Sequence, residues 1–458
     1  MDLLVRNARV VTGTESFEAN IGVEEGVIAS VSPTLRAPEA EVYDASGKTV
    51  IPGGIDAHTH MELRVTGTSS ADDFYSGTVA AACGGITTIV DFVDTQPGET
   101  LLGALAGYRR KADGKVVIDY GLHMMLKGQN LPEIDRIPDV VRKGVPSFKV
   151  YTAYKARGLM LEDRDISRVM AKVAGAGGLV AVHAESESII QRLIEKNLAA
   201  GNTEVRYHAL SRPPEAEAEA ISRVTKLAKA ASARIYVVHL SSRAGMEEID
   251  NARRRGTNVF AETCPHYLVL TDEVYVRDDA RNFVMSPPVK KAGDRAALWE
   301  GLGPGGPIET VGSDHCPFTS AEKDWGEEDF TKIPNGVPGT EAIIPLLYSE
   351  GVKKGRISMF DLVRVTSAAP AMRFGLSPSK GSLSVGADAD FVVIDPLKRV
   401  RMTADVMHSK IDYSIYDHIT TEGYPVLTVS KGEVVMEDGE VVGRRGRGRF
   451  VPRRAVAY

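Results

Sequence analysis

The sequence has few cysteines: Cys83, Cys264 and Cys316 are the only three in 458 residues. They are odd in number and far apart, which argues against a disulfide framework and for a reducing compartment. Long apolar runs are also missing, so we expect no transmembrane helix. The first residues lack a basic stretch followed by an apolar core, so we expect no signal peptide. These absences predict a soluble, cytoplasmic protein with no membrane partner.

A large excess of charge of one sign is lacking as well. The formal net charge is −6, with 25% charged and 43% hydrophobic residues. So mild an acidity gives no reason to expect nucleic acid as a partner. The segment Arg444–Arg449 is basic, but no interleaved aromatic residues or known binding module accompany it. We interpret it as a solvated or inter-subunit arm of a globular chain that can bury a large core.

Both ends of the chain are rich in short β-branched runs. Such runs fill residues 1–50 and return after Leu383, where Asp438-Gly439 separates two of them as a type I′ hairpin would. The economical arrangement is a small β-sandwich domain built from both termini, residues 1–50 and 384–458. The remaining residues, 51–383, would then be inserted as a second domain.

The middle of the chain alternates apolar runs with amphipathic helical patterns, such as Ile166, Val169, Met170 and Val173 on one helical face. The apolar runs are Ile51–Ala57, Ile86–Val90, Val116–Leu122, Ser147–Tyr151, Leu179–Val182, Ile235–Val238, Asn258–Ala261 and Thr310–Gly312. These strand–helix alternations predict an α/β fold, a (β/α)8 TIM barrel. A doubly wound sheet is the alternative, but the glycine-rich segment 175–178 precedes a strand, the wrong side for a dinucleotide loop.

Side chains that bind metals follow several of these runs. His58 and His60 are separated by one residue, so they lie on the same side of an extended strand. His183, His239 and Asp314 each follow a later run. One histidine in such a place is more often structural than a ligand. Four histidines and an aspartate at the ends of barrel strands predict a metal site, and they exceed what one tetrahedral zinc needs, so we expect two metals.

Lys149 lies inside the fourth apolar run. A buried ammonium facing a dication would be repelled, whereas a neutral amine can react with CO2 to give a carbamate. That anion has two oxygens and could bridge two metals. A lysine that reaches solvent or pairs with an acid is the alternative reading of the residue itself.

In their order along the chain, these motifs resemble those of the D-hydantoinase/dihydropyrimidinase family of cyclic amidohydrolases, within the amidohydrolase superfamily. The likeness covers nearly the whole chain. It rests on Gly53–His60, Ser147–Lys149 with Tyr154-Lys155, Glu262–Leu268, Ser286-Pro287-Pro288, Gly312–His315 and Pro334-Asn335-Gly336. The resemblance implies a TIM-barrel hydrolase of C–N bonds in cyclic amides, which usually forms homotetramers.

The resemblance also implies a binuclear centre with two Zn2+ ions per subunit, although the same ligands suit Mn2+, Co2+ or Ni2+. One metal would be bound by His58, His60 and Asp314, the other by His183 and His239, with a CO2-derived carbamate on Lys149 between them. A metal-bridging hydroxide would attack the ring carbonyl. Asp314 would pass the proton to the ring nitrogen, giving an N-carbamoyl amino acid.

The same carry-over assigns the substrate contacts. Tyr154 would stabilise the oxyanion, and Ser286 and Asn335 would hold the ring amide through backbone groups. Leu63, Tyr151 and Leu159, with Met61, Val65, Met160 and Phe318, could line an apolar pocket, although ordinary packing explains them equally well. Such a pocket would favour 5-substituted hydantoins and dihydropyrimidines over allantoin, which carries a polar ureido group.

Two other activities stay open at this point, and a third is disfavoured. An allantoinase-type hydrolase is one alternative. A non-catalytic scaffold of the same fold is another, although scaffold relatives have lost metal ligands and this chain keeps each of them. Dihydroorotases, which resemble this family, place an arginine two residues after the second histidine. Glu62 stands there in this chain, and it would repel a substrate carboxylate.

Overall fold

The computed structural model describes residues 1–65 and 67–455. A parallel sheet forms its centre, with neighbouring strands in sequence order. Its strands are β6 (Gly54–Thr59), β9 (Ile86–Val93), β10 (Asp119–Met125), β11 (Ser147–Tyr151), β12 (Leu179–His183), β13 (Ile235–Val237), β14 (Val259–Thr263) and β15 (Thr310–Val311). A bridge between Thr59 and His315 joins β6 to the segment after β15. The sheet therefore closes into the predicted barrel.

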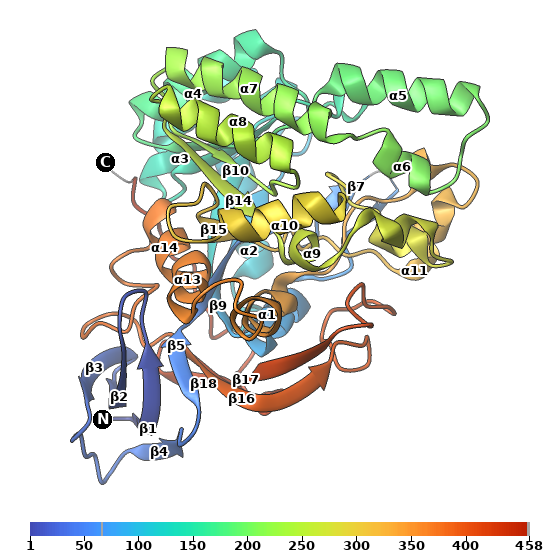
Figure 1. Cartoon of the computed structure of the whole chain (residues 1–458). Coiled ribbons are helices and arrows are strands. Elements are labelled where there is room, and N and C mark those ends of the chain that lie inside the picture. The colour runs from blue at the N-terminus through green and yellow to red at the C-terminus, as the bar shows by residue number, and fades with distance from the viewer. Residues whose placement is uncertain (66, 456–458) are drawn as a thin grey trace.

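Helices connect these strands and cover the barrel (Figure 1). They are α1 (Phe74–Cys83), α2 (Leu101–Ala112), α3 (Ile137–Arg142), α4 (Asp163–Gly175), α5 (Glu187–Ala199), α6 (Arg206–Leu210), α7 (Pro214–Ala230), α8 (Arg243–Arg254), α9 (Pro265–Val269), α10 (Ala292–Gly301), α11 (Ser320–Lys323), α12 (Ile343–Leu346), α13 (Met359–Val363) and α14 (Ala369–Arg373). In α4 the predicted apolar face is buried. Burial of such a stripe, rather than helix propensity alone, holds a helix on its barrel.

A second sheet is built from both ends of the chain, as predicted. Its strands are β1 (Leu3–Val11), β2 (Ser16–Glu24), β3 (Val27–Ser32), β4 (Glu41–Asp44), β5 (Thr49–Pro52), β16 (Phe391–Arg401), β17 (Thr420–Ser430), β18 (Glu433–Glu437) and β19 (Glu440–Val441). The two halves meet where β16 pairs antiparallel with β5 (Figure 1). The predicted division of the chain at residues 50/51 and 383/384 stays a prediction.

The hairpin signal near the C-terminus is confirmed. Asp438 and Gly439 connect β18 to β19, and both have a positive φ, 48° and 95°. A type I′ turn requires this conformation at both central residues, and Asp-Gly is among the pairs that adopt it most readily.

The run Ile51–Ala57 was predicted as one barrel strand, and this was wrong. Ile51 and Pro52 belong to β5 of the second sheet, whereas β6 of the barrel begins at Gly54. The chain crosses between the sheets at Gly53, where an added Cβ would lie 2.3 Å from Oγ1 of Thr87. An apolar run is equally typical of either sheet, so hydrophobicity alone could not locate the crossing.

The basic segment Arg444–Arg449, predicted to be a solvated or inter-subunit arm, is solvated only in part, because Arg444, Arg445 and Arg449 are exposed whereas Arg447 is buried. The carbonyl of Arg449 accepts a hydrogen bond from the backbone N–H of Tyr120, and the N–H of Val451 donates one to the carbonyl of Tyr120. This segment therefore lies along the start of β10. Arg447 and Arg453 are 9% and 2% exposed. The Arg453 guanidinium donates to the carbonyl of Leu122 and to Oγ of Ser147, at the foot of the barrel. Oxygen atoms of the protein, rather than solvent, therefore accept hydrogen bonds from Arg447 and Arg453.

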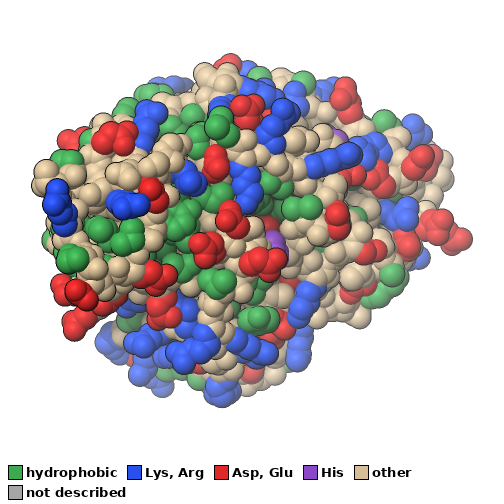
Figure 2. Space-filling model, turned by 90° about the horizontal axis from the view of Figure 1, so that it is seen from below, with side chains coloured by type: hydrophobic (Ala, Val, Ile, Leu, Met, Phe, Trp, Pro, Cys, Tyr) green, Lys and Arg blue, Asp and Glu red, His purple; other side chains and the backbone are tan. Residues whose placement is uncertain are grey.

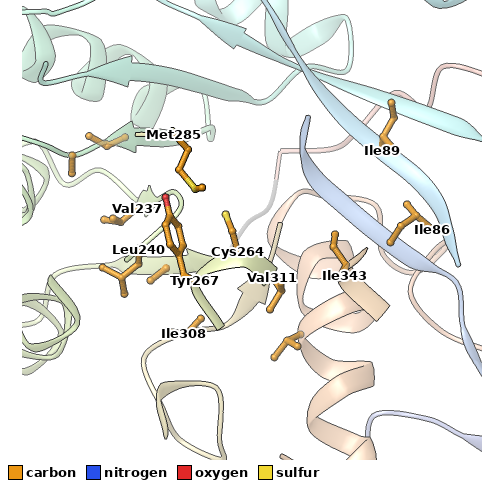
Figure 3. Close-up of a cluster of buried hydrophobic side chains, with 14 of the residues drawn as sticks. Ile86, Ile89, Val237, Leu240, Cys264, Tyr267, Met285, Ile308, Val311 and Ile343 are labelled. Carbon is orange, nitrogen blue, oxygen red and sulfur yellow. The ribbon is translucent and has the colours of Figure 1, made fainter. Parts of the chain in front are cut away.

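Buried apolar side chains form a large cluster between the barrel strands and the helices. Figure 3 shows part of it, with side chains from β9, β13, β15, α9 and α12. A separate cluster, which includes Val5, Ile21 and Phe391, fills the smaller domain. On the face seen in Figure 2, acidic and basic side chains are interspersed, and several Lys and Arg gather at the lower edge. Within the described part of the chain, no helix is long and apolar enough to cross a bilayer.

Candidate active site

Three of the predicted ligands converge at the carboxyl end of the barrel. His58 belongs to β6, His60 directly follows this strand, and Asp314 lies three residues after β15. Oδ1 of Asp314 is 3.1 Å from Nε2 of His58 and 3.2 Å from Nε2 of His60. One nitrogen or oxygen atom of each residue therefore points at a common centre, which is the arrangement of a metal site.

The other two histidines form a second convergent pair next to the first group. Nδ1 of His183, at the end of β12, is 2.9 Å from Nε2 of His239, which follows β13. Lys149 of β11 is 2% exposed, and its Nζ lies 2.9 Å from Nε2 of His58. Burial lowers the pKa of this lysine, which favours a neutral amine, although nearby Asp314 and Glu262 oppose the shift. All six predicted metal ligands are thus gathered at one place.

Two carboxylates contact the far ring nitrogens of histidines in this site, and no role was predicted for either from the sequence. Oε1 of Glu262 is 2.6 Å from Nδ1 of His58. Oε2 of Glu185 is 2.9 Å from Nε2 of His183. A ring nitrogen that donates its proton to a carboxylate leaves the other nitrogen with its lone pair free. The two carboxylates therefore favour the tautomer in which the inward-facing nitrogens of His58 and His183 carry no proton, which is the form that binds a metal.

The donor set fits a pair of divalent metals. Four imidazoles, one carboxylate and one lysine converge, and burial lowers the pKa of His60 to about 3, which keeps this imidazole neutral. Imidazole nitrogens and carboxylate oxygens suit zinc and other divalent metals of the first transition row. A second cluster, Cys83, Glu341 and His408, offers less. Both ring nitrogens of His408 already contact protein oxygens, Oε1 of Glu341 at 2.8 Å and the carbonyl of Gly439 at 3.1 Å.

Three site residues have a backbone conformation that non-glycine residues seldom adopt. His239, Asp314 and Tyr154 have φ values of 42°, 49° and 68°. Each such residue costs of the order of 1–3 kcal/mol unless the surroundings impose it, and such strain gathers at functional sites. Gly312 adds a close approach, because a Cβ there would lie 2.5 Å from Oε2 of Glu262. The local sequence therefore aims these side chains at the centre at some cost to stability.

Five of the six candidate metal ligands line one pocket: His60, Lys149, His183, His239 and Asp314. The predicted substrate-contacting residues Leu63, Tyr151, Tyr154, Leu159, Ser286 and Asn335 all line it. Asn335 donates a hydrogen bond from Nδ2 to Oγ of Ser286, at 2.9 Å. Burial raises the pKa of Tyr154, so its phenol keeps the proton that an oxyanion would accept. Met61, Met160 and Phe318, which were also candidates for the apolar pocket, are not among the lining residues.

Charged side chains that were not predicted from the sequence share this lining. Arg64, Asp94 and Arg157 also face the pocket. Glu62 does not; it forms ion pairs with Lys111 and Lys115, at 3.7 and 3.4 Å. The repulsion expected between Glu62 and a substrate carboxylate therefore has no basis in the folded chain.

Comparisons with known proteins agree with this geometry. The chain matches the amidohydrolase family over residues 49–435. It is 42% identical to a D-hydantoinase of Geobacillus stearothermophilus, covering 99% of this chain and 97% of that protein. The solved dihydropyrimidinase of Brevibacillus agri superposes with a TM-score of 0.97 at 41% identity, with both chains fully covered. An L-hydantoinase (dihydropyrimidinase) of Arthrobacter aurescens gives 0.91 at 36% identity, covering 99% of this chain and 100% of that one.

The parallel barrel carries histidines, an aspartate and a lysine at the carboxyl end of its strands. This site and the match over residues 49–435 show that the chain belongs to the amidohydrolase family. It is a hydrolase that acts on C–N bonds of cyclic amides. Within that family it falls in the D-hydantoinase/dihydropyrimidinase group. Its candidate ligands fit the metal dependence of the family.

Proposed function

We propose that this enzyme opens 5-substituted hydantoins, and also dihydropyrimidines, to N-carbamoyl amino acids. The observation that carries the proposal is the convergence of six donor side chains, five of which line a pocket together with Tyr154, Ser286 and Asn335. The names of the relatives, D-hydantoinase and dihydropyrimidinase, supply the substrate classes.

His58, His60 and Asp314 would hold one Zn2+, and His183 and His239 the second, with a carbamate on Lys149 between them. Bound metals would supply a water of lowered pKa and polarise the carbonyl to be attacked. The carbamate is supported by the burial of Lys149 and by the position of its Nζ, 2.9 Å from Nε2 of His58. A charged ammonium at that place would instead compete with a cation.

The residues of the chain then perform the proton transfers and hold the ring. Asp314, fixed between two imidazoles, takes the proton of the attacking water and delivers it to the departing ring nitrogen as the C–N bond breaks. Tyr154 donates its phenolic proton in a hydrogen bond to the oxyanion that develops on the carbonyl. Removing one such donor typically lowers the rate by about 100- to 1000-fold. Backbone groups of Ser286 and Asn335 orient the ring amide.

The test compares kcat/KM of the zinc-loaded enzyme for 5-phenylhydantoin, dihydrouracil and allantoin. We expect the hydantoin or the dihydropyrimidine to be the better substrate by at least tenfold. Allantoin hydrolysed at least tenfold faster than both would overturn the substrate assignment and leave an allantoinase-type enzyme. Tyr154→Phe, which keeps the ring and removes the donor, should lower kcat while the metal content stays at that of the wild type.

Metal content and the mass of the intact protein test the centre itself. Two zinc ions per chain, with a mass increment of one CO2 that disappears in Lys149→Ala, are expected. Zinc below about one per chain, without any hydrolysis, would support the non-catalytic scaffold instead.

We carry over the homotetramer and the cytoplasmic compartment as further parts of the proposal. The family resemblance supports the first, and three free, buried cysteines support a reducing compartment. Light scattering of the purified enzyme during gel filtration measures the oligomeric state, and a single monomeric species would contradict the tetramer.

A further inference from the structure

The outer wall of the catalytic pocket carries two arginines that have no acidic partner. Arg64 belongs to the short strand β7 (Arg64–Val65), in the segment that follows the first two histidines, and Arg157 lies in the segment after β11. Both side chains line the pocket, and both residues are exposed. Neither forms an ion pair with any carboxylate in residues 1–65 and 67–455.

The acids near these arginines are occupied elsewhere. Glu62 pairs with Lys111 and Lys115. Apart from the candidate ligand Asp314, the acid on the pocket lining is Asp94, which pairs with Lys127. The pocket mouth therefore has two positive charges that the folded chain itself does not neutralise.

The position of Arg157 relates this charge to the reacting end of the pocket. Its guanidinium carbon lies 5.2 Å from the centre of the Tyr154 ring. Arg212 approaches the same ring at the same distance, but it is buried and paired with Glu185 at 2.5 Å. Of the two arginines at Tyr154, Arg157 alone is free to bind an anion that enters the pocket.

We propose that Arg64 and Arg157 form a subsite for the 5-substituent and select substrates in which that substituent ends in a carboxylate. The inference rests on the proposed function and narrows it. Guanidinium groups bind carboxylates through paired N–H donors, and they do so better than ammonium groups because the fork is planar and permanently charged. The apolar side chains Leu63 and Leu159 on the same wall would contact the methylene groups that connect the ring to the carboxylate.

The experiment uses three hydantoins that differ only at the end of the 5-substituent: 2-carboxyethyl, 2-carbamoylethyl and propyl. The acid and the amide have almost the same shape, so their ratio of kcat/KM isolates the charge. At low ionic strength we expect the zinc-loaded enzyme to prefer the acid by about fivefold or more, since exposed ion pairs contribute a few-fold each. The preference should shrink toward unity as salt is raised, because the screening length falls to about 10 Å at 0.1 M.

Three variants test the assignment to these two residues. In Arg64→Gln/Arg157→Gln the acid-to-amide ratio should fall to about one, mainly through a higher KM for the acid. Arg64→Glu/Arg157→Glu, which inverts both charges, should reverse the preference and favour a hydantoin with a 2-aminoethyl substituent. Arg110→Gln, at an exposed position of α2 outside the pocket, is the matched control and should leave the ratio unchanged.

The outcomes separate this proposal from the one on which it rests. Equal turnover of the acid and the amide by the wild type, or a preference that survives in the double variant, would overturn the subsite while leaving hydantoin hydrolysis in place. Failure to hydrolyse any of the three compounds, including the propyl compound, would instead overturn the proposed function.

Discussion

Exchange of Glu262 for glutamine should weaken metal binding without unfolding the barrel. Oε1 of Glu262 faces Nδ1 of His58 at 2.6 Å and accepts from the backbone N–H of His239 at 3.3 Å, while Oε2 accepts from the hydroxyl of Tyr236 at 2.8 Å. The carbonyl oxygen of glutamine can keep the first two contacts. The negative charge that makes His58 a more basic ligand is lost.

The expected size follows from that difference. Loss of a carboxylate behind a ligating histidine typically lowers metal affinity by about 10- to 100-fold, or about 1.4–2.7 kcal/mol. Glu262→Ala should cost more, because the ring N–H of His58 and the hydroxyl of Tyr236 would both lose a buried acceptor, at about 1–3 kcal/mol each. Glu262→Gln should therefore lower only the affinity for metal, whereas Glu262→Ala should lower both the affinity for metal and the folding stability.

Dialysis against buffers of graded free zinc, followed by elemental analysis, gives the apparent Kd of each variant. Glu341→Gln is the control, since Glu341 also holds a histidine at 2.8 Å but lies outside the catalytic pocket. The reasoning fails if Glu262→Gln binds zinc as tightly as the wild type, or if Glu341→Gln weakens binding as much.

Other consequences can be measured on the same preparation. Lys149→Ala should lower turnover by more than about 100-fold, which is more than the loss of a residue that only supports a metal ligand typically causes. Added acetate or propionate should restore part of the turnover, and full activity without them would contradict the bridging role. Gly312→Ala should loosen metal binding, because its Cβ would lie 2.5 Å from Oε2 of Glu262, and an unchanged Kd would show that this carboxylate can move freely. Removal of metal held at 1000 times its Kd should lower the free energy of unfolding by about 4 kcal/mol, and a melting curve insensitive to chelator would refute metal binding to the folded state. Arg453→Met removes buried donors to the carbonyl of Leu122 and to Oγ of Ser147. The free energy of unfolding of the holoenzyme, measured by urea denaturation, should fall by about 2 kcal/mol. An unchanged midpoint would show that the tail has no role in stability.

The barrel and the positions of the candidate ligands could be predicted because both follow from local pattern. Apolar runs mark the strands, and the residue types that end these runs are visible in the sequence. His183 and Asp314 needed only the rule that barrel chemistry gathers at the carboxyl ends of strands.

The supporting partners could not be predicted in the same way. Glu262 lies 204 residues from the imidazole that it contacts, so no spacing rule connects the two. A signal was present, since Glu262 nearly ends the seventh barrel strand, where an ionisable side chain faces the site. The buried course of Arg453 and the ion pairs that turn Glu62 away from the pocket depend on tertiary contacts alone.

The single-residue crossing at Gly53 has a consequence for directed evolution. The second sheet runs into the strand that carries His58 and His60 with only Gly53 between β5 and β6, and Thr87 fills the space beside it. Libraries that vary residues 49–60 would mostly recover misfolded chains. In the wall formed by residues 63–65 and 157–159, the exposed Arg64 and Arg157 can be exchanged with little cost to folding, whereas Gly158, with a φ of 68°, should be kept. New substrate ranges should therefore be sought by mutating this wall, with the junction left as it is.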